Sequence, residues 1–437
     1  MNTPRPFWNV PDGSECGVDL EKPFTRPMNQ GNQMMKNRFI ACLAVAGAAS
    51  LAAPATALAT AALSDDVMLT EIRADLSRYG ATNLYHLYVS PSGNDANPGT
   101  VALPLRTIQR ASELAKPSTT IHVAPGIYTG NIDSRASGTA TERIVFISDR
   151  PGEAMVIGTG TETMWKNNGS YVDIVGFDIS GPGRLGIYNA GSYTSIVGNR
   201  VHDLAVSGGC TGSGGAGILN GNYSAMGNDI IGNTVRNIGK RGGCNGVQGI
   251  YHSNLGGVIA NNVVSGASAW GIHLWHAANK VTITNNTVVA NGSSTMGGGI
   301  VVGSGDSPGG IVLDDTKVHN NLVFDNPRSG IEQYCYTGQA CIGSRNTTMN
   351  NLVFGSARAI TLKVGTDVGT VAADPKLMNY AGGDYRLKKK SPAIDAGTAD
   401  GAPAYDVNHV SRPAGAGFDI GAFERPQAAC APAATSH

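Results

Sequence analysis

The sequence has few charged and few aromatic residues, and its charges cancel. Only 15% of the 437 residues are charged, 6% are aromatic, and 32 Lys and Arg residues balance 32 Asp and Glu residues. This balance gives no general electrostatic reason to bind nucleic acid or an anionic membrane, so we expect no nucleic acid partner. The 41% of hydrophobic residues excludes a disordered chain. The sequence therefore indicates a globular protein, which we expect to be a monomer.

One short apolar run lies near the start of the chain, from Phe39 to about Ala53. It follows Lys36 and Arg38 and precedes the small-residue sequence Ala57-Leu58-Ala59, which is typical of a secretory signal peptide over residues 35–59. The run is short for a membrane span, although an N-terminal anchor is the alternative. We expect a secreted protein, extracellular or periplasmic, with no transmembrane segment in its mature chain. Residues 1–34 are interpreted as an upstream leader or a misassigned start.

Glycine is abundant, with 59 residues, and it recurs in two phrases. The first is a small residue followed by Ile, with copies beginning at Gly186, Gly217, Gly249, Gly271, Gly299, Gly330 and Ala359. The second is Gly or Asn followed by Asn, with second residues at Asn199, Asn233, Asn262, Asn286, Asn321 and Asn351. The phrases alternate in one register, and short β-branched runs lie between them without helical periodicity. This pattern predicts an all-β fold, a single-stranded right-handed parallel β-helix whose turn asparagines stack in a ladder.

The ends of a β-helix have open strand edges that need covering. Residues 107–116 have the amphipathic pattern of a helix, with Ile108, Ala111 and Leu114 on one face, and we expect it to cap the N-terminal end. The expected organisation is a linker or cap over 60–84, the β-helix over 85–378, a C-terminal cap over 379–426 and a disordered tail over 427–437.

Five cysteines follow the predicted signal peptide: Cys210, Cys244, Cys335, Cys341 and Cys430. Cys210 and Cys244 each lie eleven residues after a ladder asparagine, so equal offsets in successive repeats predict a disulfide between them. Cys335 and Cys341 enclose five residues, and their pairing would close one loop. The spacing of metal-binding Cys-x-x-Cys is missing, so we predict no metal bound by cysteine.

Three segments carry a resemblance to a known family: YVSPSGNDANPGT from Tyr88, PLRTIQRA from Pro104 and VAPGIY from Val123. They resemble the opening of secreted right-handed parallel β-helix proteins of the pectate lyase superfamily, including polysaccharide lyase family 9. Near the end of the chain, SPAIDAG from Ser391, Arg412-Pro413 and DIGAFE from Asp419 resemble the choice-of-anchor Q segment. The resemblance implies the fold, while lyases, epimerases, hydrolases and surface proteins share it.

The resemblance also implies a calcium ion held by clustered aspartates and a lysine base, as in the family 9 lyases. The only adjacent pair in the predicted coil is Asp314-Asp315. We therefore assign no cofactor. Calcium stays an open alternative, although its usual aspartate cluster is not seen in the sequence. Of the polygalacturonase motifs, only a bare Asp-Asp is present, which argues against that hydrolase family.

Strand alternation predicts which side chains leave the coil. If the Ile of each phrase points inward, His252 and Gln333 also point inward and are expected to be hydrogen-bonded core residues. One outward column then contains Tyr188, Leu219, Tyr251, His273, Val301, Glu332 and Thr361, and the next contains Ala190, Gly221, Ser253, Trp275, Gly303, Tyr334 and Lys363. Aromatic rings on an exposed strand face are typical of surfaces on which sugar rings stack.

β-Elimination in a uronic acid polymer needs a base, an acid and a group that neutralises the carboxylate. We predict His273 as the base, Tyr251 as the acid, and Lys240 with Arg241, or Lys280, as the neutralising cations. The predicted substrate-binding residues are Trp275, Tyr188, Glu332, Tyr334, Lys280 and Lys363. These residues favour a polysaccharide lyase acting on an acidic polysaccharide.

Three alternatives stay open at this point. A loop that covers Tyr251, His273 and Trp275 would make them packing residues. A glycoside hydrolase would need a carboxylate pair, for which Glu332 and Asp306 are the available residues. A noncatalytic carbohydrate-binding protein would use the same rings without a base.

Overall fold

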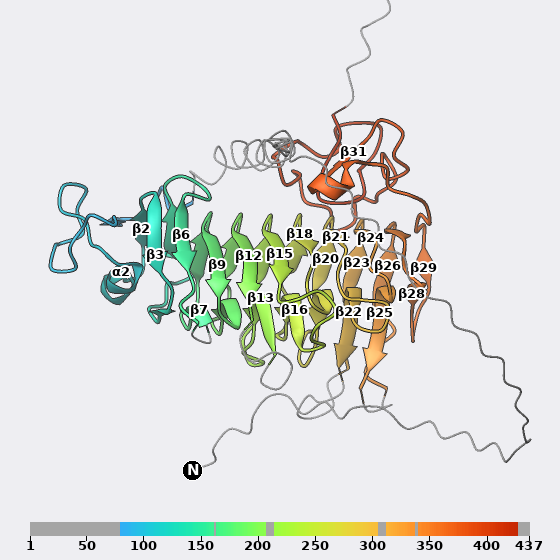
Figure 1. Cartoon of the computed structure of the whole chain (residues 1–437), viewed down its shortest axis with the longest axis horizontal. Helices are drawn as coiled ribbons and strands as arrows, with labels where there is room; N and C mark the ends of the chain where they lie inside the picture. The colour runs from blue at the N-terminus through green and yellow to red at the C-terminus, as the bar shows by residue number, and fades with distance from the viewer. Residues whose placement is uncertain (1–78, 161–162, 207–213, 305–311, 337–339, 427–437) are drawn as a thin grey trace, which may run out of the picture.

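The computed structural model describes residues 79–426 except 161–162, 207–213, 305–311 and 337–339. The predicted signal peptide, the residues before it and the predicted tail lie outside these ranges. The chain winds into a right-handed parallel β-helix, so the predicted fold is confirmed (Figure 1). No helix among the described residues is long and apolar enough to cross a membrane.

Three parallel sheets run the length of the coil; nine rungs contribute one strand to each sheet, and β1 and β29 extend sheet A at its two ends. Sheet A contains β1 (Tyr85–Val89), β2 (Thr119–Val123), β5 (Ile144–Ser148), β8 (Val172–Val175), β11 (Ser195–Val197), β14 (Asp229–Ile231), β17 (Val258–Ala260), β20 (Thr282–Thr284), β23 (Lys317–His319), β26 (Thr347–Met349) and β29 (Asp367–Val368). Sheet B contains β3 (Gly126–Thr129), β6 (Ala154–Ile157), β9 (Asp178–Pro182), β12 (Arg200–Ala205), β15 (Thr234–Ile238), β18 (Val263–Ser265), β21 (Thr287–Val289), β24 (Leu322–Phe324) and β27 (Leu352–Phe354). Sheet C contains β4 (Ile132–Ser134), β7 (Thr163–Asn167), β10 (Leu185–Asn189), β13 (Gly215–Asn220), β16 (Val247–His252), β19 (Trp270–Leu274), β22 (Gly298–Ser304), β25 (Ser329–Cys335) and β28 (Arg358–Thr361).

The predicted asparagine ladder runs through the turns between sheets A and B. Each side-chain Nδ2 donates to the Oδ1 of the asparagine one rung further along, at 2.9 to 3.1 Å, from Asn199 to Asn351. All six side chains are fully buried. A buried amide without partners is costly, so these bonds fix the register of every rung they join. The structural role predicted for the ladder is confirmed.

The two sequence phrases recur together because they touch inside the coil. A Cβ atom added to Gly271 would lie 2.4 Å from Cγ1 of Val288, and the same contact recurs between Gly299 and Val323. Real Cβ contacts are never this short, so the corner between sheets B and C admits only glycine beside that valine.

Helix α2 (Ile108–Leu114) lies at the N-terminal end of the coil, as predicted (Figure 1). Thr107 caps it by accepting a hydrogen bond from the backbone N–H of Arg110 at 3.1 Å. Ile108 and Ala111 are buried, whereas Leu114 is exposed and does not belong to the packed face.

The segment after the coil lies along the outer face of sheet B and not across the end of the coil (Figure 1). It contains β30 (Leu377–Asn379), the 3₁₀ turn Tyr380–Gly382 and β31 (Asp384–Leu387). Its Leu377, Leu387 and Ile420 pack against Leu322 and Leu352 on sheet B. The segment therefore covers the side of the last rungs.

Turn asparagines tie this segment to the coil. The first Asn of each Asn-Asn pair has a φ of 50 to 55° and donates its Nδ2 to a backbone carbonyl of the segment: Asn261 to Tyr405, Asn285 to Asp419, Asn320 to Thr398 and Asn350 to Ala396. In the preceding rungs Gly198 and Gly232 occupy this left-handed position. The change from Gly-Asn to Asn-Asn thus marks where the segment begins to cover sheet B.

Candidate active site on the outer face of sheet C

The strand register of sheet C aligns the outward column that alternation predicts. Tyr188 pairs with Leu219, Leu219 with Tyr251, and Tyr251 with His273, before the column continues to Val301, Glu332 and Thr361. The rings of Tyr251 and His273 have centroids 4.8 Å apart and are tilted by 35°. A tyrosine hydroxyl and an imidazole therefore lie on neighbouring rungs, one rung spacing apart.

Two tryptophans flank His273: Trp270 begins β19, and Trp275 follows directly after its last residue. The Trp270 and Trp275 ring centroids lie 6.5 and 5.3 Å from that of His273. Each tryptophan lies over a glycine of β22, because a Cβ on Gly298 would meet Trp270 at 2.7 Å and one on Gly303 would meet Trp275 at 2.4 Å. Glycine at these two positions of β22 thus leaves room for both indole rings.

The aromatic stripe extends from Trp275 to Tyr334, whose ring is nearly parallel to the indole at a centroid distance of 5.7 Å. Tyr334 is 37% exposed and Tyr188, at the other end of the column, is half-buried. The two ends of the stripe are therefore the parts that solvent reaches.

Sequence reasoning missed a second tyrosine–histidine pair beside the first. Tyr223 Oη and His276 Nε2 are 2.7 Å apart, and their rings stack with centroids 4.1 Å apart. The His276 ring lies 6.1 Å from that of Tyr251. Both residues lie in turns, His276 with a φ of 56°, where strand alternation assigns no direction. The only available signal was the position of His276 directly after Trp275.

The centre of the stripe is buried although its side chains point away from the coil. Tyr251 is 3% exposed, and His273 and Trp275 are 8% exposed. Tyr251 and Trp275 form an apolar cluster with Leu185 and Ala216, against which Tyr188 and Leu219 pack. Alternation predicted the direction of these side chains correctly but not their covering.

The predicted neutralising cations do not join the Tyr251–His273 pair. Arg241 donates to the carbonyl oxygens of Gly292 at 3.0 Å and Asp325 at 3.2 Å, which holds it at the corner between sheets B and C. Lys240 is exposed beside it in the same turn. Lys280 is exposed in the turn before β20, at the opposite corner, where it helps to lower the pKa of Asp315 after the larger effect of the Arg345 hydrogen bond.

Other cations lie on the sheet C face, at both ends of the stripe. The guanidinium carbon of Arg328 lies 5.7 Å from the Trp270 ring centroid. Arg328 and Arg358 hold the buried Glu332 carboxylate at 3.1 and 3.4 Å. At the other end Lys166 pairs with Tyr188 across β7 and β10. Lys363 is exposed on the rung after Tyr334.

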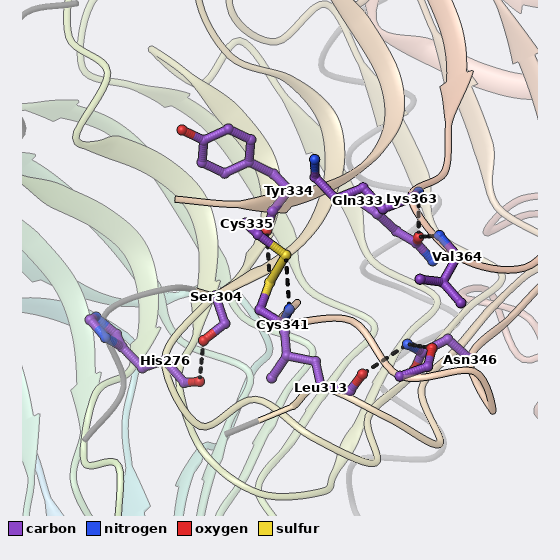
Figure 2. Close-up of a disulfide and its surroundings, with 11 residues drawn as sticks. His276, Ser304, Leu313, Gln333, Tyr334, Cys335, Cys341, Asn346, Lys363 and Val364 are labelled. Atoms are coloured by element: carbon purple, nitrogen blue, oxygen red, sulfur yellow. Dashed lines mark hydrogen bonds between the residues drawn. A yellow bond between two sulfur atoms is a disulfide. The ribbon is translucent and has the colours of Figure 1, made fainter. Parts of the chain in front are cut away.

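His252 and Gln333 point into the coil and are hydrogen-bonded, as predicted. His252 Nδ1 lies 3.0 Å from Asn220 Nδ2, and its Nε2 lies 2.9 Å from the Gly256 carbonyl oxygen. Burial lowers the pKa of His252 to about 4, so the ring is neutral inside the coil at pH 7. Gln333 Oε1 accepts from the backbone N–H groups of Lys363 and Val364 at 2.8 and 2.9 Å (Figure 2).

The predicted disulfide between Cys335 and Cys341 is present, with a Cα–Cα distance of 5.7 Å. It closes the turn directly after Tyr334, at the exposed end of the stripe (Figure 2). Cys210 lies outside the described residues, so its pairing with the buried Cys244 stays a prediction. Asp306, the suggested carboxylate partner of Glu332, also lies outside them.

The calcium cluster that the family resemblance implies does not fit the residues of the described ranges. Asp314 and Asp315 are both engaged by Arg345, at 2.8 and 2.6 Å. Elsewhere in those ranges no group of three or more His, Cys, Asp and Glu side chains is placed to hold a metal ion. No step of the chemistry below is therefore assigned to calcium.

Comparison with known proteins agrees with this architecture. A family model described as "Pel9A-like, right handed beta helix region" matches residues 87–363. The chain belongs to this Pel9A-like family. Pectate lyase PEL9 of Emericella nidulans is 26% identical over 338 residues, which cover 66% of this chain and 77% of that protein.

Two other matches, one to a short segment and one to a solved structure, are consistent with the same architecture. The uncharacterized protein YwoF of Bacillus subtilis (strain 168) is 44% identical over 61 residues, which span only 13% of its length and 14% of this chain. The crystal structure of pectate lyase Pel9A matches with a TM-score of 0.56 at 18% identity, covering 79% of this chain and 98% of Pel9A. At this identity the match shows the fold.

Proposed function

We propose that this protein is a secreted polysaccharide lyase that cleaves an acidic, uronic-acid-containing polysaccharide by β-elimination on the outer face of sheet C. The observation that carries the proposal is the cross-strand pair of Tyr251 and His273, set between two tryptophans on a Pel9A-like coil. The lyase activity of PEL9, as its name gives it, supports the reaction class.

The pair supplies the two proton transfers that β-elimination needs. His273 removes the proton from C5 of the uronic acid, the C4–O bond breaks, and a double bond forms between C4 and C5. Tyr251 donates its hydroxyl proton to the leaving glycosidic oxygen. The two ring centroids are 4.8 Å apart, so both side chains can approach one residue of the polymer.

Neutralising the uronate carboxylate makes its C5 proton easier to remove. Arg328 replaces Lys240 and Arg241 in this role, because it lies over Trp270, the ring beside His273. Lys166 at one end of the stripe, with Arg358 and Lys363 at the other, suits a polyanion that lies along the coil axis. Tyr188 and Tyr334 offer partly exposed rings for sugar stacking.

Burial of the pair sets a requirement on substrate binding. Tyr251 and His273 are 3% and 8% exposed, so the proposed reaction requires a rearrangement that opens both side chains to the polymer.

Noncatalytic polysaccharide binding is the second candidate, and the same burial favours it. In that case the exposed rings and cations bind the polymer while Tyr251 and His273 only pack. Hydrolysis ranks lower because both Arg328 and Arg358 hold the Glu332 carboxylate.

The test is to incubate the purified protein with pectate, alginate, glucuronan and glycosaminoglycans, and with a neutral glucan as control. We expect the ultraviolet absorbance of an unsaturated uronate to grow with at least one acidic polymer and not with the glucan. Falling viscosity without that absorbance would replace the lyase by a hydrolase. Binding without any cleavage would leave the noncatalytic function.

A further inference from the structure

Two polar residues next to Tyr251 are fully buried without hydrogen-bond partners for their side chains. Ser253 and Asn254 follow β16 directly, and both are 0% exposed. Neither the Ser253 hydroxyl nor either polar atom of the Asn254 side-chain amide has a partner among the described residues. Buried polar groups are almost always hydrogen-bonded, because leaving one unpaired destabilises the fold. Packing alone therefore does not account for two such residues in succession.

A longer turn from a neighbouring rung passes over these two residues. The strand register leaves residues 221–225 of the β13 rung opposite only residues 253–254 of the β16 rung, at the corner between sheets C and A. This turn carries Tyr223, whose hydroxyl oxygen lies 2.7 Å from His276 Nε2 on the β19 rung. Since β16 lies between β13 and β19 in sheet C, the Tyr223 side chain crosses the β16 rung at this corner.

The two sides of the Tyr223–His276 contact differ in how they are held. His276 is 5% exposed, and Ser304 Oγ donates a hydrogen bond to its carbonyl oxygen at 3.0 Å (Figure 2). Tyr223 is half-buried, and it meets His276 through its hydroxyl and through stacked rings with centroids 4.1 Å apart. When these contacts break, Ser253 and Asn254 gain access to the hydrogen-bond partners that they lack in the closed state, which favours opening.

The unpaired groups match the hydrogen-bonding capacity of sugar hydroxyl groups. Ser253 Oγ donates one hydrogen bond and accepts others, and the Asn254 amide donates through Nδ2 and accepts through Oδ1. A sugar hydroxyl also donates and accepts. A carboxylate only accepts, so it would leave Asn254 Oδ1 unpaired. The two side chains therefore suit the hydroxyl groups of a sugar residue better than its carboxylate.

We propose that Ser253 and Asn254 form a subsite for the hydroxyl groups of a polysaccharide residue, and that Tyr223, bonded to His276, is the gate that closes it. The ring of His276 lies 6.1 Å from that of Tyr251, so the gate is next to the side chains that the proposed reaction must uncover. The inference rests on the polysaccharide substrate of the proposed function but not on its cleavage, because binding alone reveals the subsite.

The experiment is a calorimetric titration of the full chain with pectate, alginate, glucuronan and glycosaminoglycans, together with melting temperatures. For the polymer that binds most tightly, Ser253→Ala and Asn254→Leu should each raise Kd roughly two- to tenfold, the effect of one hydrogen bond. Their melting temperatures should equal or exceed that of the wild type, because each change removes an unpaired buried group. Residues that only support the fold would instead lower the melting temperature and leave Kd unchanged.

Tyr223→Phe tests the gate with a change of opposite sign. It keeps the stacked ring and removes the hydrogen bond to His276, so the open state becomes more populated and Kd should fall roughly two- to tenfold. Tyr405→Phe is the matched control, because the Tyr405 ring also lies beside a histidine, 6.0 Å from His409, but on the C-terminal segment. It should bind the polymer as the wild type does.

The outcomes separate the subsite from the lyase reaction. Weaker binding by Ser253→Ala and Asn254→Leu without any unsaturated product would support the subsite and refute cleavage. Three results would overturn the proposal, whether or not product forms: unchanged Kd in both of these variants, unchanged or weaker binding by Tyr223→Phe, or no polymer bound by the wild type.

Discussion

The outer faces of sheets B and C follow the same two-residue alternation but serve different ends. On sheet B the outward residues of the last rungs are apolar, and the chain's own C-terminal segment covers them, tied by the first Asn of each Asn-Asn pair. On sheet C the outward residues include the Tyr251 and His273 rings beside Trp275, and cations lie at both ends of this stripe. Two-residue alternation therefore predicts which side chains point outward on both sheets. Whether the outer face is covered by the chain or carries a candidate site depends on which residue types occupy those positions.

The largest predicted effect is a difference in the free energy of unfolding between matched leucine variants on the two faces. Leu322, outward on sheet B, is fully buried beneath the C-terminal segment, whereas Leu219, outward on sheet C, is half-buried. Leu322→Ala should therefore lower the free energy of unfolding by about 2 to 5 kcal/mol, and Leu219→Ala by less than about 1.5 kcal/mol. Chemical denaturation measures both. Equal losses would mean that the two faces are covered alike.

The folded state should lose stability in acid because His252 points inward from sheet C and is neutral there. Its folded pKa of about 4 lies below the ordinary value of 6.5, so its stabilising contribution is complete above pH 6.5 and is lost as the pH falls toward 4. The loss is on the order of 3 kcal/mol.

The matched variant for this prediction is His252→Asn. Asn167, Asn189 and Asn220 form the hydrogen-bonded row that His252 continues, so His252→Asn extends an asparagine ladder with a side chain that does not titrate. We expect this variant to lose less stability than the wild type between pH 7.5 and pH 4.5 in urea denaturation. Parallel losses would contradict the assignment of this pH dependence to His252.

Replacing the two asparagines of one Asn-Asn pair should destabilise the fold to different extents. Asn286 belongs to the ladder inside the coil, whereas Asn285 bonds to the C-terminal segment outside it. Asn286 is a ladder residue whose Nδ2 donates to the Ile259 carbonyl oxygen and to Asn321 Oδ1. Asn286→Ala should cost about 2 to 3 kcal/mol, because its partners stay buried without bonds. Asn285→Gly should cost less, about 1 to 2 kcal/mol, since glycine accepts its φ of 52° while the buried bond to the Asp419 carbonyl is lost. Melting temperatures of the two variants check the order.

The smallest predicted effect concerns charge on sheet C. Arg358→Ala should raise KM for the acidic polymer roughly two- to fivefold, because the side chain contributes about the energy of one exposed ion pair. Arg386→Ala is the control, since its side chain is 46% exposed against 45% for Arg358 but lies on the C-terminal segment. The difference in KM should shrink when salt is added. An equal rise of KM in both variants would mean that the polymer does not bind specifically to sheet C.

The sequence predicted the coil, the asparagine ladder, the outward column and the Cys335–Cys341 disulfide because each repeats at a fixed offset or closes a short loop. It did not reveal that Tyr251 and His273 are covered, since alternation gives the direction of a side chain and not what packs over it. Tyr223 and His276 were missed because they lie in turns. Arg241 was misplaced because closeness along the chain says little about position around a coil.

The most direct test of the account is the rate at which unsaturated product forms with His273→Ala and Tyr251→Phe, measured on a polymer that the wild type cleaves. If His273 is the base, His273→Ala should lower turnover by roughly a hundredfold or more, the usual contribution of a positioned general base. Tyr251→Phe should also lower turnover while it keeps the ring and the melting temperature of the wild type. Full activity in His273→Ala would contradict the assignment of the outer face of sheet C as the catalytic site.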